Sequence, residues 1–294
     1  MEPQLKNRAD PLAPLRTTRG KFSMLALDQR ESLRDMFEVP LGRLGTDDEL
    51  REFKLTATKL LSRAASGVLL DKDYALDAAS IDAISPHCGL IVAADILEQI
   101  SGEPVSNTQV DETVTAEYLH GVKASAVKFL VMWRNKERKG ERADLIGRVI
   151  ELAAEAGVAS LIEALVAPEH GAHWTNFDEK NDAILEAAAE MSRYPFDLYK
   201  AQVPGYETGN LDGVEAASRQ LSSIIGSEWV VLSNGIDQSD FAEAVEAACV
   251  GGASGFLAGR AIWSDIVGSD NLDEVLRDVA RPRLEHLAKL VGAL

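Results

Sequence analysis

The stretch DLYKAQVP, residues 197–204, is a short apolar run that contains one lysine and is closed by a proline. Apart from Lys200, a run of this length and composition is typical of a strand that is buried on both faces of a parallel sheet. Charged side chains are rarely fully buried unless they are paired. The stretch therefore raises two questions: how many such strands the chain contains, and what surrounds the lysine.

Seven other runs of the same kind recur along the chain. They are FSMLAL near residue 22, GVLLD near 67, CGLIVAAD near 88, AVKFLVMW near 126, ASLIEAL near 159, WVVLSN near 229 and GFLAG near 255. Helical stretches lie between them, and several open with Asp, Asn or Ser and close on Gly, which is typical of parallel βαβ units. Eight such units without a linker favour a single (β/α)₈ TIM barrel, of the α/β class, over two doubly wound domains. We expect the barrel to span residues 21–294 and residues 1–20 to form an N-terminal arm that caps it.

The composition limits the partners and the compartment. The 294 residues carry a formal net charge of -17 at pH 7, and Lys and Arg are scattered along the chain, which argues against nucleic acid or an anionic membrane as a partner. No window reaches the roughly 18 apolar residues of a membrane span, and the N-terminus has no apolar signal-peptide core. The only cysteines, Cys88 and Cys249, stand in apolar surroundings, which indicates a reducing cytoplasm. A homo-oligomer is expected only because such assemblies are common.

Two lysines and a glutamate occupy interior positions of three neighbouring runs. Lys128 lies within AVKFLV, Glu163 within SLIEAL and Lys200 within DLYKAQV, and a TIM barrel has its active site at the C-terminal ends of its strands. A lysine in an apolar pocket beside another cation is pushed toward the neutral amine, which attacks a ketone or aldehyde to form a Schiff base. Glu163 suits general acid-base work, and an ion pair with either lysine is compatible with that role. The alternative for Lys200 is a side chain that points outward between strand and helix.

Polar and small residues follow the other strands, and we expect several of them to bind the substrate. The substrate-binding candidates are Gln29, Arg30, Asp71, Ser233, Asn234, Gly235, Gly259 and Arg260, while Asp28 is a candidate catalytic residue and Asp95 is noted only as a polar residue at a strand end. Asp28 precedes a predicted helix start, so it either caps that helix or holds a substrate hydroxyl or a lysine. The loops after the seventh and eighth strands often form the phosphate site of barrel enzymes, and Arg260 is a bidentate anion donor. The alternative there is an ordinary glycine turn beside a surface arginine.

Metal binding has weak support in the sequence. His170 and His173 stand close together in PEHGAHW, but no HExxH or CxxC spacing accompanies them. Asp71 and Asp73 are candidates for a divalent cation, or equally for a pair with Lys72 or with a strand-end amine. We therefore expect no metal and no other cofactor. The charge-rich run RNKERKGERAD, residues 134–144, is interpreted as a solvated loop or part of the barrel mouth.

The segments taken together resemble a known family. MLALDQRESLRDMF, GVLLD, LIVAAD, VKFLVMW, LIEALV, DLYKAQVP, VVLSNG and GFLAGRAIW, in this order from about Lys21 to about Ile266, resemble the class I aldolases that include tagatose-1,6-bisphosphate aldolase and sulfofructose-phosphate aldolase. Within that family, ALDQRESLR and GRAIWSDIVG are more similar to the sulfofructose-phosphate aldolases. The resemblance implies a metal-free (β/α)₈ barrel that cleaves a ketose phosphate through a lysine imine.

The resemblance also implies roles for individual residues. Lys200 matches the Schiff-base lysine, Glu163 and Lys128 match the acid-base and orienting groups, and Asp28 matches the strand-end carboxylate. The anion-binding segments are matched by Ser233, Gly235, Gly259 and Arg260.

The reaction expected from the resemblance is cleavage of 6-deoxy-6-sulfofructose 1-phosphate, a step of sulfoglycolysis, to dihydroxyacetone phosphate and sulfolactaldehyde. One alternative is tagatose or fructose 1,6-bisphosphate, which would give dihydroxyacetone phosphate and glyceraldehyde 3-phosphate. Another is a barrel that only binds a sugar phosphate. The combination of Lys200, Lys128 and Glu163 argues against the last, because a binding module has no need of a buried reactive amine.

Overall fold

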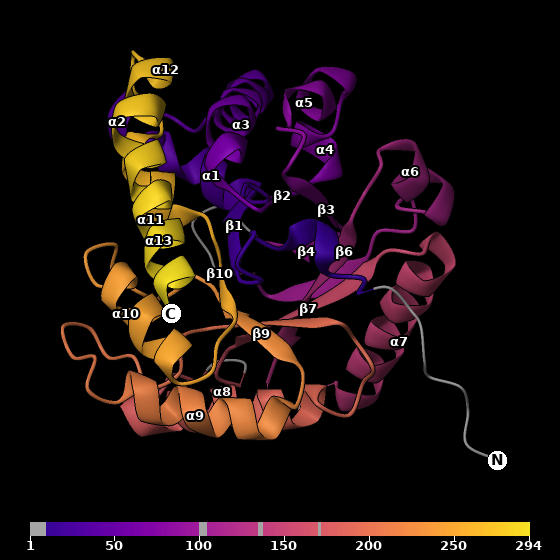
Figure 1. The fold of residues 1–294 in the computed structure, drawn as a ribbon, viewed down its shortest axis with the longest axis vertical. Coiled ribbons are helices and arrows are strands. Elements are labelled where there is room, and N and C mark those ends of the chain that lie inside the picture. The colour runs from indigo at the N-terminus through magenta and orange to yellow at the C-terminus, as the bar shows by residue number, and fades with distance from the viewer. Residues whose placement is uncertain (1–9, 100–104, 135–137, 170–171) are drawn as a thin grey trace.

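The structure is a computed structural model that describes residues 10–99, 105–134, 138–169 and 172–294. In this part of the chain, parallel strands close into an eight-stranded barrel in which each strand pairs with the next along the chain (Figure 1). Each of them overlaps one of the eight apolar runs, so the predicted TIM barrel is confirmed. The strands are β1 (Phe22–Ala26), β2 (Gly67–Leu70), β3 (Gly89–Ala93), β6 (Ala126–Trp133), β7 (Ala159–Val166), β8 (Leu198–Ala201), β9 (Glu228–Val231) and β10 (Gly255–Ala258).

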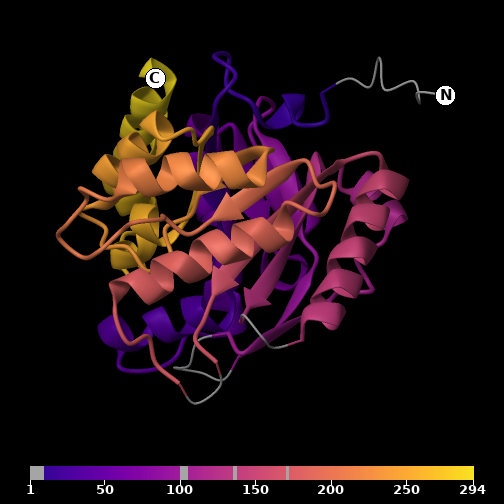
Figure 2. The same ribbon diagram turned by 90° about the horizontal axis from the view of Figure 1, so that it is seen from below.

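Helices surround the strands, as Figures 1 and 2 show from two directions. They are α1 (Glu31–Met36), α2 (Glu38–Leu41), α3 (Asp47–Leu61), α4 (Lys72–Ala75), α5 (Ala78–Ala83), α6 (Ala116–Gly121), α7 (Lys139–Ala156), α8 (Phe177–Met191), α9 (Val214–Ile225), α10 (Phe241–Val250), α11 (Arg260–Trp263), α12 (Leu272–Val275) and α13 (Arg281–Ala293). Short turns of helix are η1 (Ala13–Leu15), η2 (Ser62–Ala64), η3 (Ser264–Ile266) and η4 (Leu276–Ala280). Within the described ranges, no helix has both the length and the apolar character needed to cross a membrane.

The charge-rich run at residues 134–144 is only partly a loop. Helix α7 begins at Lys139, so the interpretation as a loop is wrong for residues 139–144, while residues 135–137 lie outside the described part. Lys, Glu and Arg are good helix formers, and Arg138 pairs with Glu141 three residues later. The charges therefore support a helix start here.

A two-stranded antiparallel hairpin follows β3 and was not predicted. Its strands are β4 (Asp95–Glu98) and β5 (Asn107–Val110), and Asp95 pairs with Val110 in the register. DILE and NTQV are short and mostly polar, so they lack the apolar pattern from which the barrel strands were recognised. The hairpin packs against β6.

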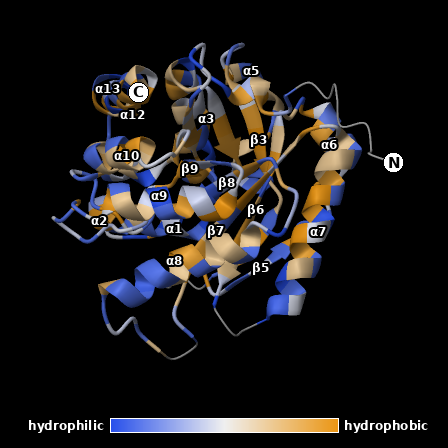
Figure 3. Cartoon of the chain, turned by 60° about the horizontal axis from the view of Figure 1, so that its bottom comes forward, coloured by the Kyte–Doolittle hydropathy of each residue, from blue (hydrophilic) through white to orange (hydrophobic). Residues whose placement is uncertain are grey.

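The apolar core has two parts. One fills the barrel with inward side chains such as Met24, Ile91 and Val230, and the other lies between the sheet and the helices. Leu12 and Leu15, in and next to η1, belong to the inner part. Leu15 lies beside Gly67 and Gly89, the first residues of β2 and β3. Figure 3 shows hydrophobic strands inside helices that carry hydrophilic residues. One end of the barrel is thus filled with apolar side chains, which leaves the other end for a site.

Candidate active site

Three neighbouring strands place Lys128, Glu163 and Lys200 inside the barrel. Glu163 of β7 stands directly opposite Lys200 of β8, and residues two positions apart on a strand face the same side. The three side chains are 1%, 5% and 3% exposed, respectively. Lys200 therefore points into the barrel, and the alternative in which it snorkels outward does not hold.

The two lysines share the Glu163 carboxylate. Lys200 Nζ donates to Glu163 Oε2 at 2.9 Å, and Lys128 Nζ lies 2.9 Å from the same oxygen. Lys128 Nζ also donates to Asp28 Oδ2 at 2.9 Å and to Asp95 Oδ2 at 3.0 Å. Lys128 thus has three carboxylate partners and Lys200 has one. Of the two uses considered for Asp28, holding a lysine is the one observed, because Arg30 takes the N-cap position of α1.

The carboxylates of Asp28, Asp95 and Glu163 keep the positive charge on Lys128. Burial opposes the charge on Lys128, but Asp28, Asp95 and Glu163 outweigh it, so the pKa of Lys128 is raised well above its ordinary value. Burial likewise opposes the charge on Asp28, yet Lys128 and Lys200 together hold the pKa of Asp28 well below its ordinary value. Lys128 and Asp28 are therefore both ionised at neutral pH, and Lys128 acts as a fixed cation.

A cavity of about 820 Å³ opens above these residues. It is large enough for a phosphorylated sugar, since small-molecule sites commonly span about 300–1,000 Å³. Several residues predicted from strand ends line it: Asp28, Gln29, Lys128, Glu163, Lys200, Asn234 and Arg260. They come from different strands and converge on one space, which is the arrangement expected at the C-terminal end of a barrel.

The loops after β9 and β10 are joined by hydrogen bonds. Arg260 donates to the Oδ1 atom of Asn234, and the Gly259 N–H donates to Ser233 Oγ at 3.4 Å. A Cβ at Gly259 would lie 2.5 Å from the carbonyl oxygen of Ala26, so only glycine allows this close approach. Burial lowers the pKa of Arg260, which has no ion pair with a described carboxylate. A partly buried guanidinium that forms no ion pair with a described carboxylate is a good anion site.

Lys180 on α8 also reaches this region and was not among the residues predicted from the sequence. A Cβ at Gly235, whose φ is +78°, would lie 3.5 Å from Lys180 Nζ and 3.8 Å from Gln202 Nε2. Burial lowers the pKa of Lys180, and no ion pair joins it to a carboxylate within the described ranges. Strand-end reasoning could not find a residue on a helix, where a lone lysine gives no signal.

Arg30 and Asp71 lie outside the lining of this cavity. Arg30 Nη1 donates to Asp95 Oδ1 at 3.2 Å, and its Nε lies 4.0 Å from Asp71 Oδ2. Asp71 is fully buried, pairs with Lys54 of α3 and accepts from the N–H of Tyr74 at 2.9 Å. Asp71 therefore serves the fold by capping α4. A substrate contact of Arg30 or Asp71 stays a prediction.

Asp95 is a central residue of the network, although the sequence pattern predicted only that it stands at a strand end. Besides Lys128 and Arg30, its carboxylate accepts from the N–H of Leu130 at 3.1 Å.

The described residues contain no group of three or more His, Cys, Asp or Glu placed to hold a metal ion. His170 of the predicted histidine pair lies outside the described residues, whereas His173 lines the cavity.

Known proteins with similar sequences are aldolases, which agrees with the geometry of the site. The model of the DeoC/LacD family of aldolases matches residues 22–265. Tagatose 1,6-diphosphate aldolase of Staphylococcus aureus (strain bovine RF122 / ET3-1) is 26% identical over 309 residues, which cover 94% of this chain and 93% of that protein. Tagatose 1,6-diphosphate aldolase 1 of Enterococcus faecalis is 26% identical over 268 residues, which cover 84% of this chain and 81% of that one.

Solved structures share the fold at lower identity. An archaeal fructose 1,6-bisphosphate aldolase superposes with a TM-score of 0.65 and 15% identity, covering 97% of this chain and 98% of that one. The fructose-bisphosphate aldolase of Plasmodium falciparum gives a TM-score of 0.69 and 16% identity, covering 97% and 96%. These likenesses support the barrel architecture.

Proposed function

The chain belongs to the DeoC/LacD family of aldolases and is a class I aldolase, a lyase, and from this premise we propose that Lys200 forms the Schiff base with a ketose 1-phosphate. The observation that carries the proposal is the 2.9 Å hydrogen bond from Lys200 Nζ to Glu163 Oε2 at the cavity that the strand ends enclose. A buried amine with a proton acceptor at this distance has the geometry of an activated nucleophile.

The first half of the reaction makes the imine. Lys200 passes a proton to Glu163, and the neutral amine attacks the C2 carbonyl of the ketose to give a carbinolamine. Glu163 then returns the proton to the C2 hydroxyl, which leaves as water, and an iminium remains on Lys200. Each transfer uses the short Lys200–Glu163 contact. Lys128, held by Asp28 and Asp95, keeps its charge and fixes the Glu163 carboxylate.

The second half breaks the carbon chain. Glu163 takes the proton of the C4 hydroxyl, the C3–C4 bond breaks, and its electron pair moves into the iminium to form an enamine while an aldehyde leaves. Protonation of C3 by Glu163 restores the iminium. Water then adds to C2, which releases dihydroxyacetone phosphate and regenerates the Lys200 amine. The ionised carboxylate of Glu163 is restored at the end of this half.

The C1 phosphate is assigned to the loops after β9 and β10. Arg260 and Lys180 are the cations near these loops, and neither forms an ion pair with a described carboxylate. Asn234 and Gly235 lie between them. Strand β9 is the neighbour of β8, which carries Lys200, so a phosphate on these loops is adjacent to the reactive amine, as C1 is adjacent to C2.

The first candidate for the whole substrate is 6-deoxy-6-sulfofructose 1-phosphate, which would give dihydroxyacetone phosphate and sulfolactaldehyde. The segments ALDQRESLR and GRAIWSDIVG support it. The second candidate is tagatose 1,6-bisphosphate, which the names of the S. aureus and E. faecalis relatives support, and fructose 1,6-bisphosphate is related to it. A sulfonate and a phosphate accept from the same donors, so both fit an anion site.

The test is release of dihydroxyacetone phosphate from these substrates, measured side by side. We expect the wild-type protein to release it from at least one of them and the Lys200→Met variant to release none. The matched control is Lys59→Met, which removes an exposed lysine of α3 and should retain full activity. The proposal is wrong if no substrate releases triose phosphate or if Lys200→Met stays active. Comparable rates with the sulfonate and bisphosphate sugars would remove the preference for the first candidate.

A further inference from the structure

Three arginines stand where β6 leads into α7, and two of them are neutralised. Arg138 donates to both carboxylate oxygens of Glu141, at 2.6 and 2.7 Å. Arg142 donates to both oxygens of Glu190, at 3.0 and 2.8 Å, and is buried with it. Each of these guanidinium groups thus serves a protein carboxylate.

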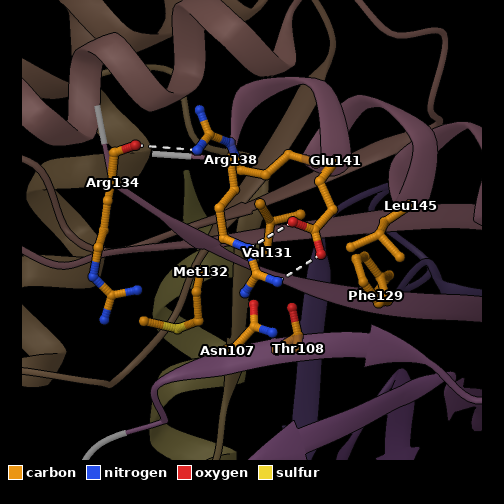
Figure 4. Close-up of a pocket in the computed structure, with 10 residues that line it drawn as sticks. Asn107, Thr108, Phe129, Val131, Met132, Arg134, Arg138, Glu141 and Leu145 are labelled. Atoms are coloured by element: carbon orange, nitrogen blue, oxygen red, sulfur yellow. Dashed lines mark hydrogen bonds and ion pairs between the residues drawn. The ribbon is translucent and has the colours of Figure 1, made fainter. Parts of the chain in front are cut away.

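The third, Arg134, has no such partner. Its Nε donates to the carbonyl oxygen of Pro168 at 3.0 Å and its Nη1 to that of Ser106 at 2.9 Å, and it forms no ion pair with a described carboxylate. Figure 4 shows the side chain extending away from the Arg138–Glu141 pair. A guanidinium has five N–H groups, so three remain after these two bonds. Arg134 is therefore a half-buried cation that two carbonyl groups hold in place and that has N–H groups without an acceptor among the described residues.

Arg134 lines the same cavity as Lys200 and Arg260. It directly follows β6, whereas Arg260 follows β10, and three strands separate β6 from β10 in either direction around the closed barrel. Strand β8, with Lys200, is the middle strand of one of these two paths. On two opposite sides the cavity thus has an arginine that forms no ion pair with a described carboxylate, and the reactive amine lies between them.

We propose that Arg134 binds the anionic group at the end of the ketose far from C1. The inference rests on the proposed function, in which the Arg260 side takes the C1 phosphate and Lys200 takes C2. Going around the barrel, β9, β8, β7 and β6 then present the C1 phosphate site, Lys200, Glu163 and Arg134, which is the order of C1, C2, C4 and the terminal carbon along the sugar. The enzyme is therefore selective for ketoses that carry charge at both ends.

The surroundings of Arg134 favour this assignment. Asp35 and Glu169 also line the cavity, so an anion bound there needs a cation close by. The two main-chain carbonyls hold the guanidinium in place before the ligand arrives, which reduces the cost of ordering a long side chain. A planar guanidinium can also donate two parallel N–H groups to a phosphate or a sulfonate.

The test compares substrates that differ only at C6. The kcat/KM for fructose 1,6-bisphosphate and for 6-deoxy-6-sulfofructose 1-phosphate is divided by that for fructose 1-phosphate, whose C6 is uncharged. We expect these ratios to exceed one in the wild type and to fall about tenfold or more in Arg134→Gln, as loss of a charge-assisted contact implies. Arg134→Lys should fall less, and the matched control Arg138→Gln should retain the wild-type ratios.

The outcomes separate the two proposals. An Arg134→Gln variant that keeps the wild-type ratios overturns the assignment of Arg134 alone. If Arg134→Gln does not fold, the wild type still decides, because ratios near one for both charged substrates overturn it as well. A wild-type protein that cleaves none of the three sugars overturns the proposed function, and the role of Arg134 with it.

Discussion

Lys128 is the residue on which the site depends electrostatically. It is the common partner of Asp28, Asp95 and Glu163, which are all nearly inaccessible to water. Two of these carboxylates come from other parts of the barrel, at the ends of β1 and β3. A single ammonium on β6 therefore links the ends of β1 and β3 to β7 and also fixes the acid-base group beside Lys200.

We expect Lys128→Met to destabilise the fold by about 3–5 kcal/mol, because it leaves buried carboxylates without their cation. The free energy of unfolding in urea at pH 7 measures this, with Lys59→Met as the control. Adding Asp28→Asn to Lys128→Met should restore part of the loss, since it removes one of the uncompensated charges. A change below about 1 kcal/mol in Lys128→Met would show that the network contributes little to stability.

The lowered pKa of Asp28 in the folded protein implies that its stability depends on pH. Its pKa is lower in the folded protein than the ordinary value of about 3.9 expected when unfolded, so the unfolded state binds the proton more readily. The stabilisation is therefore fully present above about pH 5 and is lost as the pH falls through 4 toward the folded pKa. We expect the urea midpoint of the wild type to fall more steeply between pH 5 and pH 3 than that of Asp28→Asn. Parallel curves would contradict this account.

At the scale of elements, the parts that could be predicted are those marked by their own residues, and the parts that could not are those that depend on other segments or have no apolar pattern. The barrel strands were recognisable because each is a continuous apolar run, and the interior positions of Lys128, Glu163 and Lys200 followed from those runs. The β4–β5 hairpin could not be recognised, because its two strands are short and mostly polar and lack the continuous apolar run that marks the barrel strands. Lys180 was missed because its surroundings come from other segments. Arg134 was recognised only as part of a charge-rich run interpreted as a solvated loop or part of the barrel mouth, because the carbonyls that hold it also come from other segments.

The pairing of β10 with β1 requires glycine at position 255. Gly255 has φ +141°, and a Cβ there would lie 1.9 Å from the carbonyl oxygen of Phe22. We expect Gly255→Ala to destabilise the fold by at least about 1–3 kcal/mol, measured by urea unfolding. The control is Gly147→Ala in α7, where a Cβ meets nothing within 4 Å and helix propensity predicts a gain of about 0.5–1 kcal/mol. Equal effects at both positions would refute the argument from close approach.

At the scale of the whole molecule, the apolar cluster that stabilises the barrel and the cavity with the reactive groups lie at opposite ends of the barrel. Leu12 and Leu15 pack with the inner apolar cluster at one end, while the cavity and its charged groups lie at the other. The closed order of the strands was predictable from eight repeated units, since each unit specifies its neighbour. The full extent of the N-terminal arm, a cytoplasmic location and a homo-oligomeric state stay predictions.

Leu15→Ala tests the separation of the two ends. Leu15 is fully buried, so we expect a loss of about 2–5 kcal/mol in unfolding free energy from the lost contacts and the cavity that remains. KM and kcat for the preferred sugar should stay within about twofold, because Leu15 lies beside the first residues of β2 and β3 and does not line the cavity. Leu44→Ala, at a side chain 41% exposed, is the matched control and should change the unfolding free energy little. A large rise in KM in Leu15→Ala would show that the ends are coupled.

The central claim is that Lys200 is the residue that forms the imine, and trapping the imine tests it most directly. The wild-type protein is incubated with dihydroxyacetone phosphate, reduced with borohydride and digested, and the modified peptide is located by mass. We expect one covalent adduct, on Lys200, which is absent in Lys200→Met and present in Lys59→Met. No adduct, or an adduct on Lys128 with Lys200 unmodified, would contradict it.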